Sequence, residues 1–115
     1  MNNWTVVELA FRCDRLSLRM ERLAQNFLRM GAMSLDGFDA ETVRSIVKES
    51  KVFIELTAID LDIDSAFELA QIQRQLSRWD IHWLETWAND ASRIEISTLS
   101  QAWANRIREM AGIFV

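Results

Sequence analysis

The feature that most constrains this fold is an apolar run near the N-terminus whose spacing alternates between three and four residues. Side chains three and four positions apart lie on one side of an α-helix, so the run predicts a helix with a coiled-coil-like apolar seam. Thr5 and Glu8 form a capping box at its start, and Gly31 suits the left-handed residue that follows a helix. The first predicted helix therefore spans about residues 5–30. Its seam consists of Val6, Leu9, Cys13, Leu16, Met20, Leu23, Phe27 and Met30.

Three more helices are predicted from apolar spacing together with residues that favour helix N-termini. Asp39 precedes the second helix as its N-cap. Ser65 with Glu68, and Thr98 with Gln101, form capping boxes before the third and the fourth. These helices are expected to span about residues 40–60, 66–90 and 98–113.

The scarcity of turn-forming residues supports a helical class. The 115-residue chain has no proline and three glycines, whereas β-sandwiches and barrels need many turns built from these residues. Half of the residues are hydrophobic and 26% are charged, which is typical of a chain that builds a core. We therefore predict an all-α fold, an antiparallel bundle of four helices that forms a single domain over residues 1–115.

The cellular location is predicted from the single cysteine and from the distribution of apolar residues. Cys13 has no partner for an internal disulfide, which fits a reducing compartment, and its seam position predicts a buried, inert thiol. The N-terminal residues lack the pattern of a signal peptide, and no uncharged apolar stretch reaches about eighteen residues. We therefore expect no membrane span and a cytoplasmic location.

Motifs for catalysis are missing from the sequence. His82 is the only histidine, and no Ser/His/Asp motif, phosphate-binding glycine loop or zinc-type cluster is present. A single histidine among aromatic residues is weak evidence for haem. We therefore predict a protein that is not an enzyme and that uses no cofactor.

One acidic stretch resembles part of a calcium loop. Asp60, Asp62 and Asp64 fall at the first, third and fifth positions of such a loop. However, Ser65 stands where the loop needs glycine, and Gln71 stands where it needs a bidentate glutamate. The sequence therefore predicts no metal site in this stretch.

The most distinctive polar feature is a ladder of five arginines along the first predicted helix, interrupted only at Asn26. Residues 1–30 hold five arginines and three acids, a net of +2, whereas residues 36–68 hold nine acids and three bases, a net of −6. Antiparallel neighbouring helices would bring these segments together, so intramolecular ion pairs are one explanation. The other is a partner-binding face formed by Arg12, Arg15, Arg19, Arg22 and Arg29.

A second candidate site is a row of tryptophans. Trp79, Trp83 and Trp87 recur every four residues, so they are expected to share one face of the third predicted helix. They form either an aromatic core stripe or a partly exposed patch, since tryptophan is enriched at interface hot spots. Both interpretations stay open, and the three residues are candidate partner-binding residues.

These features favour a small adaptor, regulator or assembly factor that binds another protein. The first helix is predicted to be longer than the second and fourth, so part of its seam is expected to stay uncovered and to favour a homodimer. There are two alternatives. The arginine ladder would suit nucleic acid, and the acidic segment over residues 36–68 would suit an immunity-type inhibitor that masks a basic target.

Overall fold

A computed structural model describes the backbone of residues 5–112 and the side chains in that range other than those of Leu9, Ala10, Arg12 and Cys13. Over this range the chain forms six helices and no strand, so the predicted all-α class is confirmed. The helices are α1 (Val6–Cys13), α2 (Leu16–Asp36), α3 (Ala40–Ala58), α4 (Ile63–Ile81), α5 (Trp83–Ala88) and α6 (Asp90–Met110). None of them is both long enough and apolar enough to cross a membrane.

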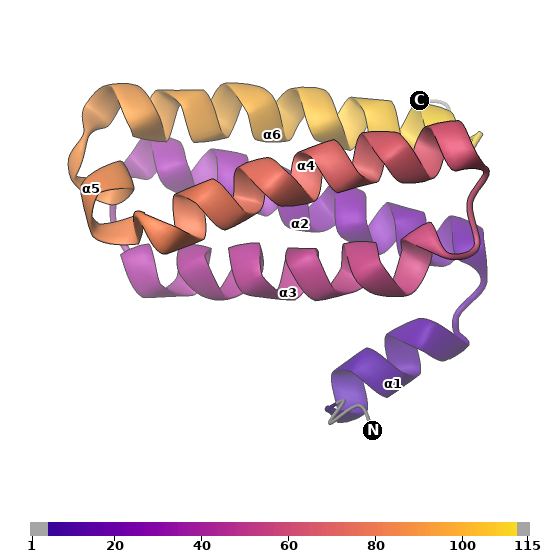
Figure 1. Ribbon diagram of the computed structural model, residues 1–115. Coiled ribbons are helices and arrows are strands. Elements are labelled where there is room, and N and C mark those ends of the chain that lie inside the picture. The colour runs from indigo at the N-terminus through magenta and orange to yellow at the C-terminus, as the bar shows by residue number, and fades with distance from the viewer. Residues whose placement is uncertain (1–4, 113–115) are drawn as a thin grey trace.

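The four long helices, α2, α3, α4 and α6, run side by side, and each runs opposite to the one before it (Figure 1). We call these four helices the bundle. Within it, α2 packs against both α3 and α6, and α3 packs against α4. α1 lies outside the bundle against α3, and α5 forms the corner between α4 and α6 (Figure 1). The chain therefore has more helices than the four predicted, because the first and third predicted helices each divide in two.

The first division falls at Asp14 and Arg15, which are both extended and separate α1 from α2. On the N-terminal side of this break the seam residue Val6 is 84% exposed, and Phe11, which is not a seam residue, is buried. The side chains of the other two seam residues there, Leu9 and Cys13, lie outside the described part of the chain. The Phe11 ring stacks on the Phe53 ring of α3 with 3.8 Å between the ring centroids. This contact places α1 against α3, away from the direction that a continuous helix would take.

The first predicted helix is also wrong at its C-terminal end, because α2 continues past Gly31 to Asp36. The left-handed residue that ends α2 is Gly37, with a φ of 75°. Gly31 instead lies within the helix beside α6, where an added Cβ would be 3.4 Å from the carbonyl oxygen of Ser97. Gly31 therefore lies where two helices pack closely rather than in a turn, and only a small side chain would fit there.

The remaining boundaries depend on which polar residue caps each helix. Asp39 caps α3 as predicted, by accepting a hydrogen bond from the backbone of Thr42. Asp62, not Ser65, caps α4, so that helix begins earlier than expected. Asn89 accepts hydrogen bonds from two backbone N–H groups at the start of α6, so the predicted cap Thr98 lies inside that helix. The stretch over residues 90–97 is therefore helical.

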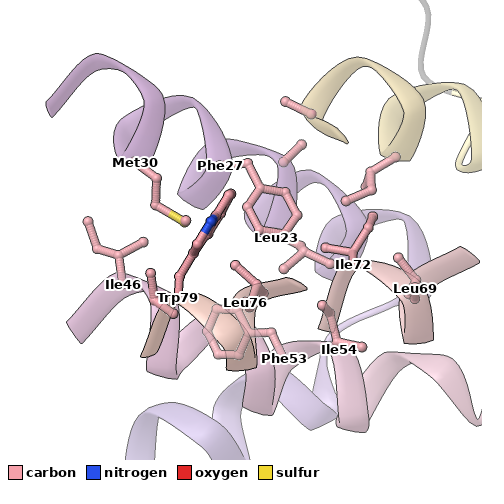
Figure 2. Packing of buried hydrophobic residues seen from close by; sticks show 14 of the residues in the cluster. Leu23, Phe27, Met30, Ile46, Phe53, Ile54, Leu69, Ile72, Leu76 and Trp79 are labelled. Carbon is pink, nitrogen blue, oxygen red and sulfur yellow. The ribbon is translucent and has the colours of Figure 1, made fainter. Parts of the chain in front are cut away.

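The core lies between the facing sides of the bundle helices (Figure 2). On α2 the seam is fully buried from Met20 to Met30, with its members at most 1% exposed. α6 is 21 residues long, the same length as α2, and packs along it. The seam of α2 is thus covered within the chain. The expected uncovered stretch, which motivated the homodimer, is not found there.

Two substitutions at Gly31 should have opposite effects on stability. Gly31→Ala is expected to raise the free energy of unfolding by about 0.5–1 kcal/mol, because alanine favours the helix and its Cβ would make ordinary van der Waals contacts. Gly31→Ile is expected to lower it by about 1–3 kcal/mol, because the longer side chain would push α2 and α6 apart. Urea denaturation measures both. An alanine variant that is as unstable as the isoleucine variant would contradict this packing.

The Asp62 cap should make the stability depend on pH. Hydrogen bonding from the side chain and backbone of Ser65 lowers the pKa of Asp62 below its ordinary value of 3.8. A carboxylate whose pKa is lowered by folding stabilises the fold above its unfolded pKa, and this contribution is lost as the pH falls through the lowered value. Asp62→Asn keeps a capping oxygen but removes the titration. Its melting temperature should therefore fall less than that of the unmodified protein between about pH 5 and about pH 2.

The matched control for this prediction is Asp64→Asn. It removes another exposed acid from the same turn of α4, and that acid accepts no capping hydrogen bond within the described part of the chain. Equal pH dependence in Asp62→Asn and Asp64→Asn would show that the Asp62 cap does not contribute.

Candidate protein-binding surface

Arg19 of the ladder connects three parts of the chain and is 6% exposed. Its Nε donates to the carbonyl oxygen of Asp14 at 3.1 Å, and its Nη1 donates to the carbonyl oxygen of Leu56 at 2.8 Å. Its Nη2 lies 2.8 Å from Oδ2 of Asp60, which belongs to the acidic segment. The two carbonyls lie at the C-terminal ends of α1 and α3, where a positive charge is favoured. Arg19 is therefore engaged within the molecule.

Arg22 is also engaged within the molecule. Its Nη1 lies 2.9 Å from Oδ2 of Asp14, in the break between α1 and α2. Its guanidinium stands 5.5 Å from the centroid of the Phe11 ring and 5.7 Å from that of Phe53. A guanidinium over aromatic rings is attracted by their negative faces. Arg22 thus covers the aromatic contact that places α1 on α3.

The remaining members of the ladder do not form one continuous cationic strip. Arg15 and Arg29 are exposed, and the side chain of Arg12 lies outside the described part of the chain, as does that of Cys13. Asn26, the missing step, is buried, and its Nδ2 donates to Glu49 and Ser50 of α3. Arg19, Arg22 and Asn26 thus make contacts within the fold, whereas Arg15 and Arg29 are separate surface charges.

The tryptophan row does not lie on one helix face, because α4 ends before His82 and Trp83 begins α5. Trp79 is 4% exposed and contacts Trp103 of α6, and Trp83 is 2% exposed. Trp87 is partly buried and stacks on Trp83. Trp79 and Trp83 belong to the core, as a core stripe requires. Whether any of the three contacts a partner stays a prediction.

A group of exposed apolar side chains occurs at one end of the bundle, on three bundle helices and on α5. These residues belong to the last turn of α2 and the turn after it, to the corner formed by the end of α4 and by α5, and to the second turn of α6. Figure 1 shows that these parts meet at the same end of the bundle, where α5 is labelled. We call this group the apolar end: Leu35, Phe38, Ile81, Leu84 and Ile94, which are 65%, 69%, 74%, 80% and 57% exposed.

The apolar end cannot be recognised in the sequence, because its members come from two stretches separated by more than forty residues. The one local signal is Phe38, a large aromatic residue in a predicted connection between helices. Connections between helices are usually polar, so a phenylalanine there is unusual.

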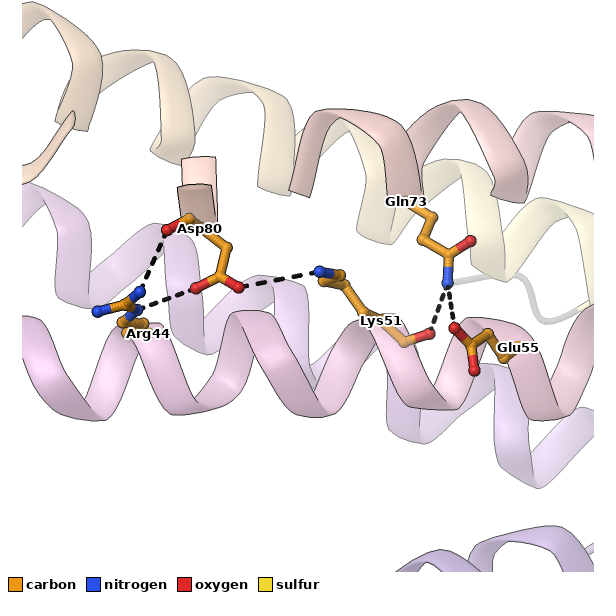
Figure 3. Close-up of polar contacts among 5 residues, drawn as sticks. All are labelled: Arg44, Lys51, Glu55, Gln73 and Asp80. Carbon is orange, nitrogen blue, oxygen red and sulfur yellow. Dashed lines mark hydrogen bonds and ion pairs between the residues drawn. The ribbon is translucent and has the colours of Figure 1, made fainter. Parts of the chain in front are cut away.

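Ion pairs between α3 and α4 fix one side of the apolar end (Figure 3). Arg44 donates from Nε to Oδ1 of Asp80 at 2.9 Å and from Nη2 to the carbonyl oxygen of Asp80 at 3.3 Å. Lys51 lies 3.8 Å from the other carboxylate oxygen of Asp80. Further along, Gln73 donates to the carbonyl oxygen of Lys51 and to Glu55 (Figure 3). The contacts of Asp80 hold the end of α4, and with it Ile81, beside the start of α3.

Arg93 fixes the other side of the apolar end. It pairs with Asp90, donates to the carbonyl oxygen of Trp87, and stands 5.8 Å from the centroid of the Trp87 ring. A Cβ added to Gly37 would lie 3.3 Å from Nε of Arg93, so the turn after α2 rests on this side chain. One partly buried arginine therefore links α5, α6 and the turn that carries Phe38.

The acidic segment over residues 36–68 is not one continuous negative surface. Asp60 pairs with Arg19, Glu68 pairs with Arg106 of α6, and Asp62 caps α4. These contacts lie at the end of the bundle opposite α5 (Figure 1). Three other acids of the segment are exposed around the start of α3, next to the apolar end: Asp36, Asp39 and Glu41.

The described residues contain no group of three or more His, Cys, Asp or Glu side chains arranged to hold a metal ion. Comparison with protein-family models, with curated proteins and with solved structures finds no match to this chain.

Proposed function

We propose that this chain is a non-enzymatic, protein-binding helical domain and that the apolar end is its binding surface. The observation that carries the proposal is the group of five large apolar side chains, each at least 57% exposed, at one end of the bundle. Single exposed apolar residues are normal, but a group of them favours association because water leaves apolar surface when a partner covers it. Ion pairs and Arg93 hold the elements that carry this group, so the surface exists before a partner arrives.

The arginine ladder gives weaker support to nucleic-acid binding. A phosphate-tracking surface needs several solvated cations in a row. Arg19 is buried, and Arg22 is paired with Asp14. We therefore propose that the ladder mainly stabilises the fold, and we keep nucleic-acid binding as an outcome that the experiments below test.

A homodimer stays a prediction, although the seam that motivated it is covered by α6. The surface available for self-association is now the apolar end. Light scattering over a range of protein concentrations measures the oligomeric state. A dimer that dissociates when Phe38 and Leu84 are both changed to serine would place the second copy on this surface.

Site-specific photo-crosslinking in cells tests the proposed function. A benzophenone amino acid replaces Phe38 at the apolar end, and a matched variant carries it in place of Phe67. The two phenylalanines are similarly exposed, at 69% and 65%, but Phe67 lies on α4 at the other end of the bundle. We expect irradiation to give a protein adduct from position 38 and much less adduct from position 67.

A second variant shows whether such an adduct reports binding. Changing Leu84 to serine removes a neighbouring apolar side chain and should reduce the adduct from position 38, because the partner loses buried apolar area. Equal adducts from positions 38 and 67, or an adduct that is indifferent to Leu84→Ser, would overturn the proposal. An adduct with nucleic acid rather than protein would support the alternative function, nucleic-acid binding.

A further inference from the structure

The apolar end lies in a strongly negative part of the molecule. Residues 34–44 and 80–95, which contain it, hold seven acidic side chains and two arginines, a net of −5 with His82 neutral. The whole chain has a net charge of −4, so the rest of the protein carries a net of +1. The surface around the apolar end therefore carries a net negative charge.

The two arginines do not neutralise this field, because each is already paired with an acid. Arg44 pairs with Asp80, and Arg93 pairs with Asp90. The five other acids are exposed and form no ion pair with any residue that the structure describes. They are Asp36, Asp39, Glu41, Glu85 and Glu95.

Two pockets on this end have apolar walls. One, of about 240 Å³, is lined by Ile81 and Leu84 together with Glu85 and with Arg44, which pairs with Asp80. The other, of about 270 Å³, is lined by Leu35 and Ile94 together with Asp90 and Arg93, which pair with each other. An apolar side chain of a partner can enter either pocket, and Glu85 is an acid at the wall of the first that is unpaired among the described residues.

We infer that the partner segment that docks on the apolar end is basic, rich in lysine or arginine and carrying large apolar side chains. This inference rests on the proposed function and names the chemistry of its partner. The apolar side chains of the segment fill the two pockets, and its cations face the exposed acids. Complementary charge of this kind sets partner choice and speeds association.

The same field argues against the other occupants. A second copy of this chain would bring an equal negative surface into contact with the first, and like charges that meet across an interface are unfavourable. Nucleic acid and anionic lipid surfaces are negative too, so the field repels them. A basic protein segment is the occupant that both the charge and the apolar area favour.

Peptide binding tests the inference. The probes are three peptides of equal length: one of leucine and lysine in helical spacing, one with glutamate in place of each lysine, and one with serine in place of each leucine. Isothermal calorimetry with the full chain measures the Kd of each peptide. We expect the leucine–lysine peptide to bind at least about tenfold more tightly than either of the others, and to weaken as salt is added.

Matched variants of the protein locate the binding. Glu85→Gln combined with Asp36→Asn removes two acids beside the apolar end, and Asp64→Asn combined with Glu55→Gln removes two acids away from it. The first pair should weaken binding of the leucine–lysine peptide about tenfold and reduce the salt dependence of that binding, whereas the second pair should have little effect.

A second pair of variants tests the apolar contacts. Leu84→Ser should weaken binding of the same peptide, and Ile63→Ser at the other end of the bundle should not. Circular dichroism verifies that each variant is folded.

The outcomes separate this inference from the proposed function. Tight binding of the glutamate peptide, or no binding of the leucine–lysine peptide, would overturn the basic partner while the crosslink from position 38 still supported a binding surface. Binding that weakens equally in the two acid-to-amide pairs would show general charge attraction and would also overturn the inference. A missing crosslink at position 38 would overturn the proposed function itself.

Discussion

Replacing Phe27 with alanine is expected to lower the free energy of unfolding by about 3–5 kcal/mol, the largest effect that we predict for a single substitution. Phe27 lies on the seam of α2 and is fully buried. Its ring meets the Trp103 ring of α6 edge-on, with 5.4 Å between the centroids, and it faces the core side chains in Figure 2. Alanine would remove this apolar area and leave a cavity between α2 and α6. Urea denaturation followed by circular dichroism measures the change.

Leu35→Ala is the matched control on the same helix. Leu35 is 65% exposed, so its truncation should change the free energy of unfolding by no more than about 0.5 kcal/mol. A Phe27→Ala variant as stable as this control would mean that α6 does not cover α2. In that case the seam of α2 would be uncovered in the monomer, which would again favour a homodimer.

Arg19→Ala is expected to lower the free energy of unfolding by about 2–3 kcal/mol. The substitution leaves the carbonyl oxygen of Leu56 without its buried donor and Asp60 without its ion pair. It also releases Asp14 at the break between α1 and α2. Loss of a charged donor to buried carbonyls costs more than loss of a surface ion pair. Urea denaturation measures this change as well.

Arg29→Ala tests the same ladder at an exposed position. We expect it to change stability by less than about 0.5 kcal/mol, because Arg29 makes no ion pair or side-chain hydrogen bond with the described residues. If both arginine variants were equally stable and both lost affinity for duplex nucleic acid, the ladder would be a binding face. Our prediction is the reverse, with a stability difference between the variants and no specific nucleic-acid binding.

Local signals in the sequence determined a large part of this fold. The capping box of Thr5 and Glu8 and the cap at Asp39 are found where predicted, because each depends on residues three apart. The apolar spacing also identified the buried side of α2 from Met20 to Met30. Arg19 and Asn26, each one residue from a seam position, are buried as well. Periodicity needs only neighbours along the chain, so it can be read without a structure.

Contacts between distant residues decided the features that the sequence left open. The break at Asp14 lets Phe11 stack on Phe53 of α3, and the sequence alone does not show that these rings meet. The sequence places Gly31 at a helix end, because only the position of the neighbouring helix, here Ser97 of α6, shows that this glycine lies inside a helix. The start of α6 at Asp90 also depends on a neighbouring helix. A stretch with a weak apolar pattern becomes helical when the bundle gives it a surface to pack on.

The candidate binding surface also depends entirely on contacts between residues that are distant in the sequence. In the sequence, Leu35 and Ile94 are two apolar residues in unrelated segments, and neither is distinguishable from a core residue. Burial depends on the direction in which each helix faces, and packing against the other helices sets that direction. Thus the sequence by itself determined the class, most of the helices and the buried side of α2. Only the packing of the helices determined which apolar residues stayed in water, because exposure is a property of the assembled surface.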